Sequence, residues 1–348
     1  MKKYLKIILF ILTYLVIASC TKHNDNNLIT PTHGGVDTTP IIPTTTNPDT
    51  STTGINTPLP LGINYTASPP IILNGAHDII ISGLAIQNPQ GICIHLQNCY
   101  NIIIRNCKLG PSKQTGVELY KCRNITVDSC YMSSISTGLY AEQSSAIQFK
   151  YNSVKNVQGP YPKGAMVQYD NVNGAGNRIL YNRCENISGA SNPEDAISMY
   201  MSNGTADEPI LIAGNWIRGG GPSKNGGGIM TGDNGGSYII AKDNILVNPG
   251  NYGIGIAGGT NIQILNNKIF SSRTTVSNVG VYIWNQSKSG CSLNTISGNR
   301  VNWTSLLGEF NNSWNNGNCG TVTGWATNIW GAALTADILP QQLIPDIK

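Results

Sequence analysis

A short segment of alternating apolar residues recurs nine times along the chain, at intervals of about 23 to 32 residues. Each copy has the form apolar-x-apolar-x-x-Asn/Cys-x-apolar, and the copies begin at Ile79, Ile102, Ile125, Ile147, Ile179, Leu211, Ile239, Ile262 and Asn294. A second short apolar segment, usually opened by glycine as in GVELYKC, lies between successive copies. Alternating side chains are typical of strands, and one pair of strands cannot bury its own apolar face. We therefore predict that these strand pairs stack as the coils of a parallel solenoid.

The composition supports an all-β chain. Only 11% of the residues are charged, against about 25% in an ordinary soluble domain, and 39 residues are glycine. Gly, Asn, Ser, Thr and Ile are residues of turns and strands, whereas helical bundles need Ala, Leu, Glu, Lys and Arg. The net charge of +4 is spread along the chain without a basic cluster. We therefore expect no nucleic-acid partner.

One polar position stays in register when the copies are aligned. Its residues are Cys107, Cys130, Asn152, Cys184, Asn215, Asn244, Asn267 and Asn299. Asparagine suits such a ladder because it tolerates left-handed backbone and its amide both donates and accepts hydrogen bonds. The repeat and the ladder resemble the right-handed parallel β-helix family of pectate-lyase-like proteins over about residues 64–302. The resemblance implies an all-β, right-handed parallel β-helix solenoid of about nine coils.

The resemblance does not supply a reaction, because one solenoid carries many different sites. The RxPxxR-type motif of pectate lyases and the NTD, DD, GHG and RxK segments of polygalacturonases do not occur in this sequence. The region from Glu194 to Gly259 looks like uncharacterised bacterial β-helix proteins.

The N-terminus predicts export. Three lysines precede the apolar run Ile7 to Ala18, which is too short to span a membrane and is typical of a signal peptide. The run ends at Ser19-Cys20, which resembles the lipobox of bacterial lipoproteins and implies that Cys20 is lipidated. We expect a signal peptide at 1–19 and a Thr/Pro-rich disordered tether at 20–60. These segments would anchor the protein to the bacterial cell envelope, at the outer membrane, with the facing side left open.

The remaining chain divides into the β-helix at 61–302 and a C-terminal cap at 303–348, which contains four tryptophans. Cysteines fall at equivalent positions on adjacent coils, as stacked thiols or as disulfides. Those pairs are Cys99 with Cys122 and Cys107 with Cys130. Cys291 and Cys319 lie in Gly/Asn-rich loops, where a disulfide would pin the C-terminal segment.

The outward residues of the second strand favour a groove for a polysaccharide, because aromatic rings stack on sugars and polar groups bond their hydroxyls. Alternate residues give one row of His95, Tyr120, Glu142, Gln168, Tyr200, Gly232, Ala257 and Trp284. The neighbouring row is Cys93, Glu118, Tyr140, Met166, Ser198, Met230, Gly255 and Tyr282. The predicted substrate-binding residues are Tyr120, Tyr140, Glu142, Asp170, Tyr200 and Arg218. The alternative is that exposed tyrosine is simply favourable in a sheet.

Ionisable residues gather at the ends of these strands. Lys163 and Asp195 precede the second strand on adjacent coils, and Asp170 and Asp233 follow it. Acid–base cleavage of a glycan needs two carboxylates, or a base beside a neutralised uronate. We predict Lys163, Asp195 and Asp233 as catalytic residues, with Glu194 and Asp195 as Ca²⁺ ligands if a cation is used. The alternative is a surface ion pair.

Two functions follow from these observations. The first is an exported, lipid-anchored polysaccharide lyase or glycosidase with its groove along the second strand. The second is a non-catalytic envelope protein that binds glycan or has a structural role. Both imply a polysaccharide partner and a membrane contact through the lipid, and we expect a monomer. No cofactor other than Ca²⁺ is implied.

Overall fold

Each coil of the solenoid contains three β-strands, as the first complete coil illustrates: β2 (Ile71–Asn74), β3 (His77–Ser82) and β4 (Leu84–Asn88). This computed structural model describes residues 63–160 and 164–346. The sequence predicts two strands in each repeat because it treats the segment from Ile79 as one strand. That prediction is wrong, since Gly83 takes φ 71° and bends the backbone between β3 and β4. Left-handed residues such as Asn106, with φ 51°, make the same bend on other coils.

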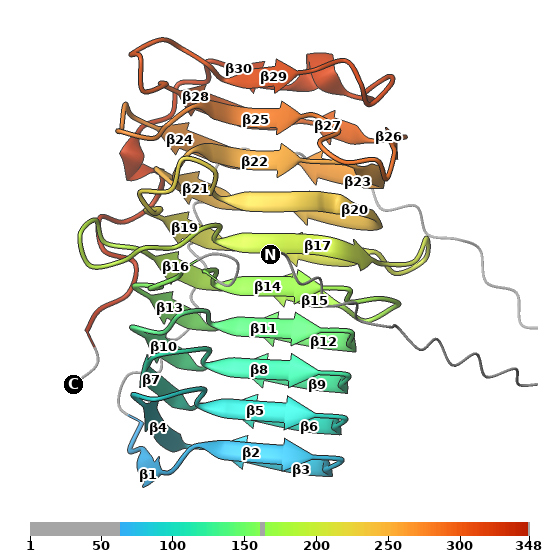
Figure 1. The fold of residues 1–348 in the computed structure, drawn as a ribbon. Helices are drawn as coiled ribbons and strands as arrows, with labels where there is room; N and C mark the ends of the chain where they lie inside the picture. The colour runs from blue at the N-terminus through green and yellow to red at the C-terminus, as the bar shows by residue number, and fades with distance from the viewer. Residues whose placement is uncertain (1–62, 161–163, 347–348) are drawn as a thin grey trace, which may run out of the picture. The chain divides into compact units, whose positions relative to one another are not determined.

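Equivalent strands stack in parallel register and form three faces (Figure 1). The first face contains β2, β5 (Ile94–Gln97), β8 (Val117–Tyr120), β11 (Leu139–Glu142), β14 (Val167–Asp170), β17 (Ile197–Asn203), the start of β20 (Ile229–Lys242), β22 (Tyr252–Ile256), β25 (Val279–Ile283) and β29 (Ser313–Asn315). The second face contains β3, β6 (Tyr100–Arg105), β9 (Arg123–Asp128), β12 (Ser145–Lys150), β15 (Arg178–Leu180), β18 (Ile210–Ala213), the end of β20, β23 (Gly259–Leu265), β26 (Cys291–Ser292) and β27 (Thr295–Ser297). The third face contains β1 (Thr66–Ser68), β4, β7 (Lys108–Ser112), β10 (Tyr131–Ser133), β13 (Ser153–Lys155), β16 (Arg183–Glu185), β19 (Trp216–Arg218), β21 (Ile245–Val247), β24 (Lys268–Ser271), β28 (Arg300–Trp303) and β30 (Ile329–Trp330). Nine complete coils run from β2 to β28.

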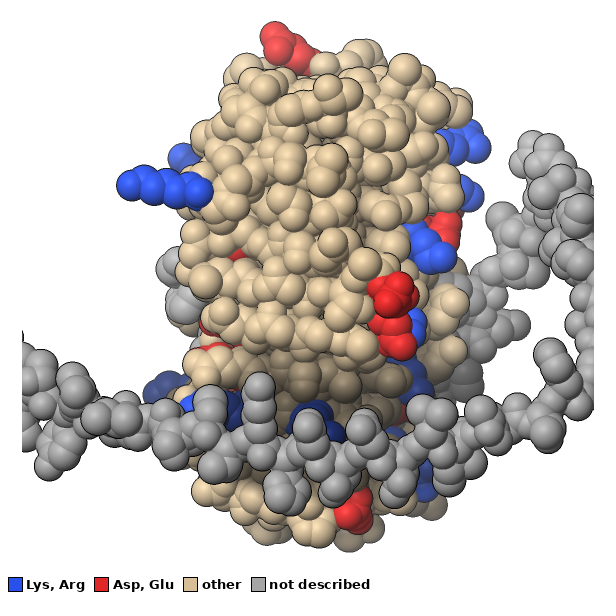
Figure 2. Space-filling view, turned by 90° about the vertical axis from the view of Figure 1, so that its right-hand side faces the viewer, with Lys and Arg blue, Asp and Glu red and all other residues tan. Residues whose placement is uncertain are grey.

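The core is a stack of apolar rows that run along the solenoid. On the first face, one inward row consists of Ile94, Val117, Leu139, Val167, Ile197, Ile229, Ile254 and Val281. All of these side chains are fully or almost fully buried. Figure 2 shows that charged residues are sparse on the side of the solenoid in view. Because stacked coils place equivalent residues next to each other, a charged row would repel itself.

The asparagine ladder is present, with one correction and one extension. Side-chain amides donate to the next carbonyl along the series, and the described part of the ladder is Asn152, Asn182, Asn215, Asn244, Asn267, Asn299 and Asn328. The ladder position predicted for Cys184 is wrong. Asn182 occupies it, whereas Cys184 lies in β16 and packs in the core. Cys130 continues the ladder through its backbone N–H, which donates to Asn152 Oδ1 at 2.9 Å.

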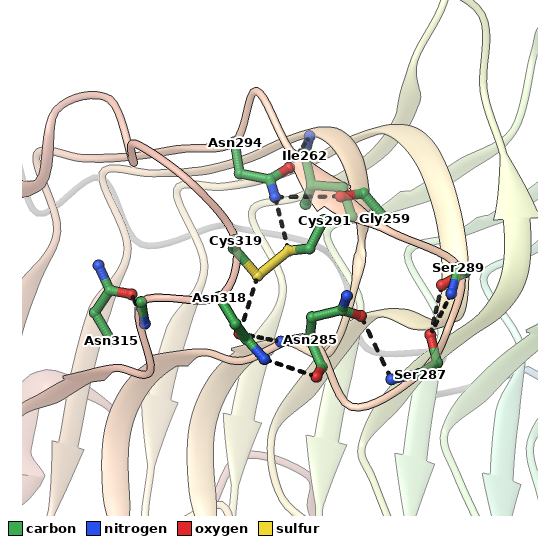
Figure 3. The surroundings of a disulfide bond; sticks show 11 residues. Gly259, Ile262, Asn285, Ser287, Ser289, Cys291, Asn294, Asn315, Asn318 and Cys319 are labelled. Carbon is green, nitrogen blue, oxygen red and sulfur yellow. Dashed lines mark hydrogen bonds between the residues drawn. A yellow bond between two sulfur atoms is a disulfide. The ribbon is translucent and has the colours of Figure 1, made fainter.

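The coil pattern continues past residue 302, where the sequence places the start of the cap. β29 pairs with β25 and β30 pairs with β28, so a partial tenth coil covers the ninth. A disulfide between Cys291 and Cys319 ties these two coils together (Figure 3). The remaining described cysteines are buried free thiols, as in a stacked-thiol arrangement of Cys99 with Cys122 and Cys107 with Cys130.

The chain after β30 runs back along the third face as an extended segment, residues 331–346, that we call the strap (Figure 1). Its Leu339, Leu343 and Ile344 are buried against Tyr131 and Val247, on strands far apart in the solenoid. The short 3₁₀-helix η2 (Ala336–Ile338) lies within the strap, and η1 (Trp325–Thr327) precedes β30. Among the described residues, no helix has the length and apolar character needed to cross a membrane.

Candidate functional site

The outward side chains of the first face form two rows, and both predicted rows need correction. One row is His95, Glu118, Tyr140, Gln168, Ser198, Met230, Gly255, Tyr282 and Trp314. The other is Gln97, Tyr120, Glu142, Asp170, Tyr200 and Asp233. The predicted rows mixed these two sets because an alignment error of two residues keeps a side chain on the same face but moves it to the next row. The same shift also took in Cys93 and Met166, which precede β5 and β14, outside the strand alternation, and are buried in the core.

An acidic hollow of about 420 Å³ opens on the first face over β14, β17 and β20. It brings together Asp170, Glu194, Asp195, Tyr200 and Asp233, all of which the sequence analysis singled out. Its remaining lining residues are Gly164, Ala165, Gln168, Ser198, Asn225, Met230 and Gln286. Asp170 and Asp233 belong to one outward row with Tyr200 between them, whereas Glu194 and Asp195 come from the turn before β17.

Asp195 is the most perturbed carboxyl group of this hollow. Its side chain is only 8% exposed, and Oδ1 accepts hydrogen bonds from the Gly227 backbone N–H at 2.9 Å and from the Tyr252 hydroxyl. Burial raises the pKa of Asp195 to about 7, aided by the negative charges of Glu194 and Asp233 and opposed by the two hydrogen bonds. Among the described residues, Oδ2 has no hydrogen-bond partner and is free to hold a proton. Asp195 therefore carries a carboxyl group that exchanges a proton near neutral pH.

The other carboxylates of the hollow differ from Asp195 in their surroundings. Burial raises the pKa of Asp233, and a backbone hydrogen bond from Asn234 opposes this shift. Asp170 is held by two donors, the Tyr140 hydroxyl at 2.8 Å from Oδ2 and the Asn171 amide at 2.9 Å from Oδ1. These hydrogen bonds fix the orientation of the Asp170 side chain.

Three predicted binding residues lie on the first face without lining the hollow, namely Tyr120, Tyr140 and Glu142. Tyr140 is nearly buried and acts through Asp170, and its hydroxyl is also 3.4 Å from Glu142 Oε2. Tyr120 lies in the row of Asp170, two strands away, with the Lys121 ammonium 4.8 Å from its ring centroid. The structure therefore places the Tyr140 hydroxyl against Asp170 and not in the lining of the hollow.

A second, aromatic hollow of about 300 Å³ adjoins the first. Asn225, Met230 and Gln286 line both hollows, so the two form one groove along the first face. The other lining residues of the aromatic hollow are Lys224, Asn251, Tyr252, Asn278, Val279, Tyr282, Trp284 and Trp314. The sequence analysis missed Asn225, Gln286 and the role of Trp314. The two polar residues lie on loops outside the repeat, and Trp314 lies in the segment predicted to be a cap.

Lys163 and Arg218 complete the predicted site residues. Lys163 lies outside the described residues. Arg218 was predicted to bind substrate, and that prediction needs correction. It lies in β19 on the third face, where its Nη2 donates to the carbonyls of Ala336 at 2.6 Å and Leu339 at 2.7 Å. Its guanidinium therefore holds the strap.

The Ca²⁺ ligand hypothesis for Glu194 and Asp195 gains no support from this arrangement. Within residues 63–160 and 164–346, no group of three or more His, Cys, Asp or Glu side chains is placed to hold a metal ion. Oδ1 of Asp195 already accepts two hydrogen bonds, which leaves Oδ2 as its open donor to a cation.

Residues 70–241 match the family described as right handed beta helix region. Together with the nine coils, this match makes the chain a right-handed parallel β-helix protein, and the predicted fold class is confirmed. No curated relative matches the chain in sequence.

Solved structures are similar to this chain at low sequence identity. The catalytic domain of a GH87 alpha-1,3-glucanase in complex with nigerose is 16% identical, with a TM-score of 0.48 over 74% of this chain and 50% of that one. A double mutant of the tailspike protein of E. coli bacteriophage HK620 is 12% identical, with a TM-score of 0.42 over 75% of this chain and 56% of that one. The chain thus spans about half the length of these structures.

Proposed function

We propose that this protein is a polysaccharide-cleaving enzyme of the glycoside hydrolase type, with its active site in the acidic hollow. The observation that carries the proposal is Asp195, a buried carboxyl group with a pKa raised to about 7 that lines an open hollow beside three other carboxylates. Glycoside hydrolysis uses one carboxyl group that is protonated at working pH and a second that is ionised. The acidic hollow supplies one carboxyl group with a strongly raised pKa and three further carboxyl groups beside it.

Asp195 is the proposed general acid and Asp233 the proposed second carboxylate. The proton on Asp195 Oδ2 passes to the glycosidic oxygen as the bond between that oxygen and the anomeric carbon breaks. The oxygen of a water molecule bonds to the anomeric carbon, and the carboxylate of Asp233 takes the proton that this water loses. The hydrogen bonds from Gly227 and Tyr252 to Oδ1 stabilise the Asp195 carboxylate as it forms.

Asp170 is proposed to bind substrate rather than to transfer protons. Its two oxygens accept from Tyr140 and Asn171, which fixes the carboxylate in one orientation. Tyr200 lies between Asp170 and Asp233, and its hydroxyl accepts from the Asn234 amide at 3.1 Å. Sugar hydroxyl groups would bond to this fixed row of acceptors and donors.

We further propose that the enzyme works at the bacterial cell envelope, held by a lipid on Cys20. The proposal is supported by the apolar run Ile7 to Ala18 and the lipobox-like end at Ser19-Cys20. The Thr/Pro-rich segment at 20–60 would separate the β-helix from the membrane and let it reach a polymeric substrate.

The test is a reducing-end assay of the purified protein on a panel of soluble polysaccharides, with absorbance of unsaturated products recorded in parallel. New reducing ends without unsaturated products support the hydrolase. Asp195→Asn and Asp233→Asn are each expected to lower kcat at least 100-fold, whereas the matched control Asp243→Asn, at a corner of the coil away from the groove, keeps wild-type activity. Unsaturated products would instead indicate a lyase, with Lys163 as its base. Binding of glycan without any turnover would contradict an enzymatic function and favour a glycan-binding protein.

A further inference from the structure

The groove on the first face has two chemically different halves. One half is the acidic hollow, with the carboxyl groups of Asp170, Glu194, Asp195 and Asp233. The other half is aromatic, with Tyr252, Tyr282, Trp284 and Trp314, and its one charged lining residue among those described is Lys224. Because Met230, Asn225 and Gln286 belong to both halves, a linear ligand that enters one half continues into the other.

The tryptophans of the aromatic half are partly open to solvent. Trp284 is 39% exposed and Trp314 is 42% exposed, and their ring centroids lie 5.6 Å apart at an interplanar angle of 65°. Such an edge-to-face pair leaves part of a ring face uncovered. Large exposed aromatic side chains that border a hollow mark a binding surface.

The tyrosines beneath the tryptophans are fixed in place. Tyr252 and Tyr282 are almost fully buried and pack edge to face at 5.2 Å between ring centroids. The Tyr282 hydroxyl accepts from the Gln286 amide at 3.2 Å and points to Met230 Sδ at 3.3 Å. Gly255 lies below Tyr282, and a Cβ atom at that position would come within 2.4 Å of the ring. A glycine at this point of the row therefore lets the Tyr282 ring lie flat over β22.

We infer that the groove takes an uncharged polysaccharide, whose chain crosses the acidic hollow and stacks its next sugars on Trp284 and Trp314. This inference rests on the proposed function and names its substrate class. Apolar C–H faces of neutral sugars pack on indole rings, and the Asn225, Asn251 and Gln286 amides offer donors and acceptors to their hydroxyl groups. A uronate polymer would place its carboxylates beside the carboxyl groups of the acidic hollow, where like charges repel.

The test measures binding separately from turnover. The full chain carrying Asp195→Asn is run through native gels that contain a soluble neutral glucan, mannan or xylan, or polygalacturonate. We expect retardation by at least one neutral polymer and none by polygalacturonate. Adding Trp314→Ala or Trp284→Ala is expected to weaken the retardation at least tenfold in Kd. The matched control Tyr151→Ala removes a tyrosine of similar exposure, 36%, at the corner between the second and third faces, and should leave Kd unchanged.

Two results would overturn the inference, namely stronger retardation by polygalacturonate than by every neutral polymer, or unchanged binding in both tryptophan variants. Near-ultraviolet circular dichroism of each variant confirms that its aromatic packing is intact. The proposed hydrolase fails in a different way. If the wild-type protein binds neutral glycan through Trp314 but releases no reducing ends, the inferred aromatic subsite stands and the proposed hydrolase activity is contradicted.

Discussion

Asp195 shows how a single buried carboxyl group connects the fold to chemistry. The turn before β17 removes its side chain from water, and the Gly227 amide and Tyr252 hydroxyl give its Oδ1 two donors without neutralising it. The upward effect of burial on the pKa of Asp195 exceeds the downward effect of the two hydrogen bonds, so this pKa rises to about 7. The same desolvation that suits the group to its proposed role as an acid also makes its ionised form unfavourable in the folded protein.

This balance predicts a pH-dependent stability. The folded-state pKa of about 7 lies above the unfolded value near 3.8, so between these values the native state binds more protons than the unfolded state. Stability therefore falls as pH rises from about 4 to 7, by on the order of a few kcal/mol. Asp195→Asn cannot ionise and is expected to flatten this fall. Urea unfolding followed by circular dichroism between pH 5 and pH 8 measures it, and equal slopes in wild type and Asp195→Asn would contradict the buried-charge account.

The asparagine ladder connects the turns of successive coils through side-chain hydrogen bonds. Asn215 is fully buried, and its amide donates to the Ile179 carbonyl at 3.0 Å and to Asn244 Oδ1 at 2.9 Å. Its own Oδ1 accepts from the backbone and side chain of Asn182. One residue thus connects three successive coils at the corner between the second and third faces.

Asn215→Ala is expected to lower the free energy of unfolding by about 3 to 5 kcal/mol, because several buried donors and acceptors lose their partner at once. Chemical denaturation gives the value. Asn173→Ala is the matched control, since Asn173 is exposed and its loss should cost less than about 1 kcal/mol. Similar losses in the two variants would show that the ladder adds nothing beyond an ordinary surface amide.

The strap gives a second prediction about an element. Arg218 holds it through the carbonyls of Ala336 and Leu339. Buried Glu185 accepts from the backbone N–H groups of Leu343 and Ile344, and Lys155 Nζ donates to the Ile344 carbonyl. Arg218→Leu is expected to raise the rate of proteolysis within residues 331–346 at least tenfold, because local opening becomes easier. Mass spectrometry of timed digests measures this rate.

The control for the strap is Arg178→Leu, which removes a half-exposed partner of Glu208 on the second face. It should leave the digestion pattern unchanged. Arg218→Leu should also keep wild-type glycan cleavage, since the strap covers the third face and the groove lies on the first. Loss of cleavage with an intact strap would restore Arg218 to the substrate site.

The repeat makes the fold predictable, because each inward row is written nine times in the sequence and a solenoid is the structure that buries all copies together. The site is less predictable. A shift of two residues keeps a side chain on its face, so the sequence predicts outward side chains but places His95 and Gln168 in the row of Tyr200 instead of the row of Tyr140. Arg218 could not be placed because its partners lie 118 and 121 residues away, on a strap whose path no periodicity describes.

At the scale of the whole molecule, the stacking of coils explains both the low charge content and why the charged groove stands out from the rest of the surface. Stacked coils exclude charge from most rows, so the carboxyl groups of the acidic hollow are a local exception on an otherwise nearly neutral solenoid. Such a surface gives little long-range attraction to a neutral polymer. A means of holding the protein near its proposed substrate would therefore raise the effective concentration of the groove, and a lipid on Cys20 would supply one.

Cys20→Ala is expected to move the protein from the membrane fraction to the soluble fraction of a bacterial host that processes lipoproteins. The thioether to the lipid forms only at a cysteine, and no other residue at position 20 replaces it. Fractionation with immunoblotting and metabolic labelling with palmitate measure the change. Thr21→Ala, which alters the neighbouring residue, should remain labelled and membrane-bound. Cleavage of soluble glycan by Cys20→Ala should equal that of wild type, because the groove lies within residues 164–314. Membrane retention without Cys20 would contradict a lipid anchor at this residue.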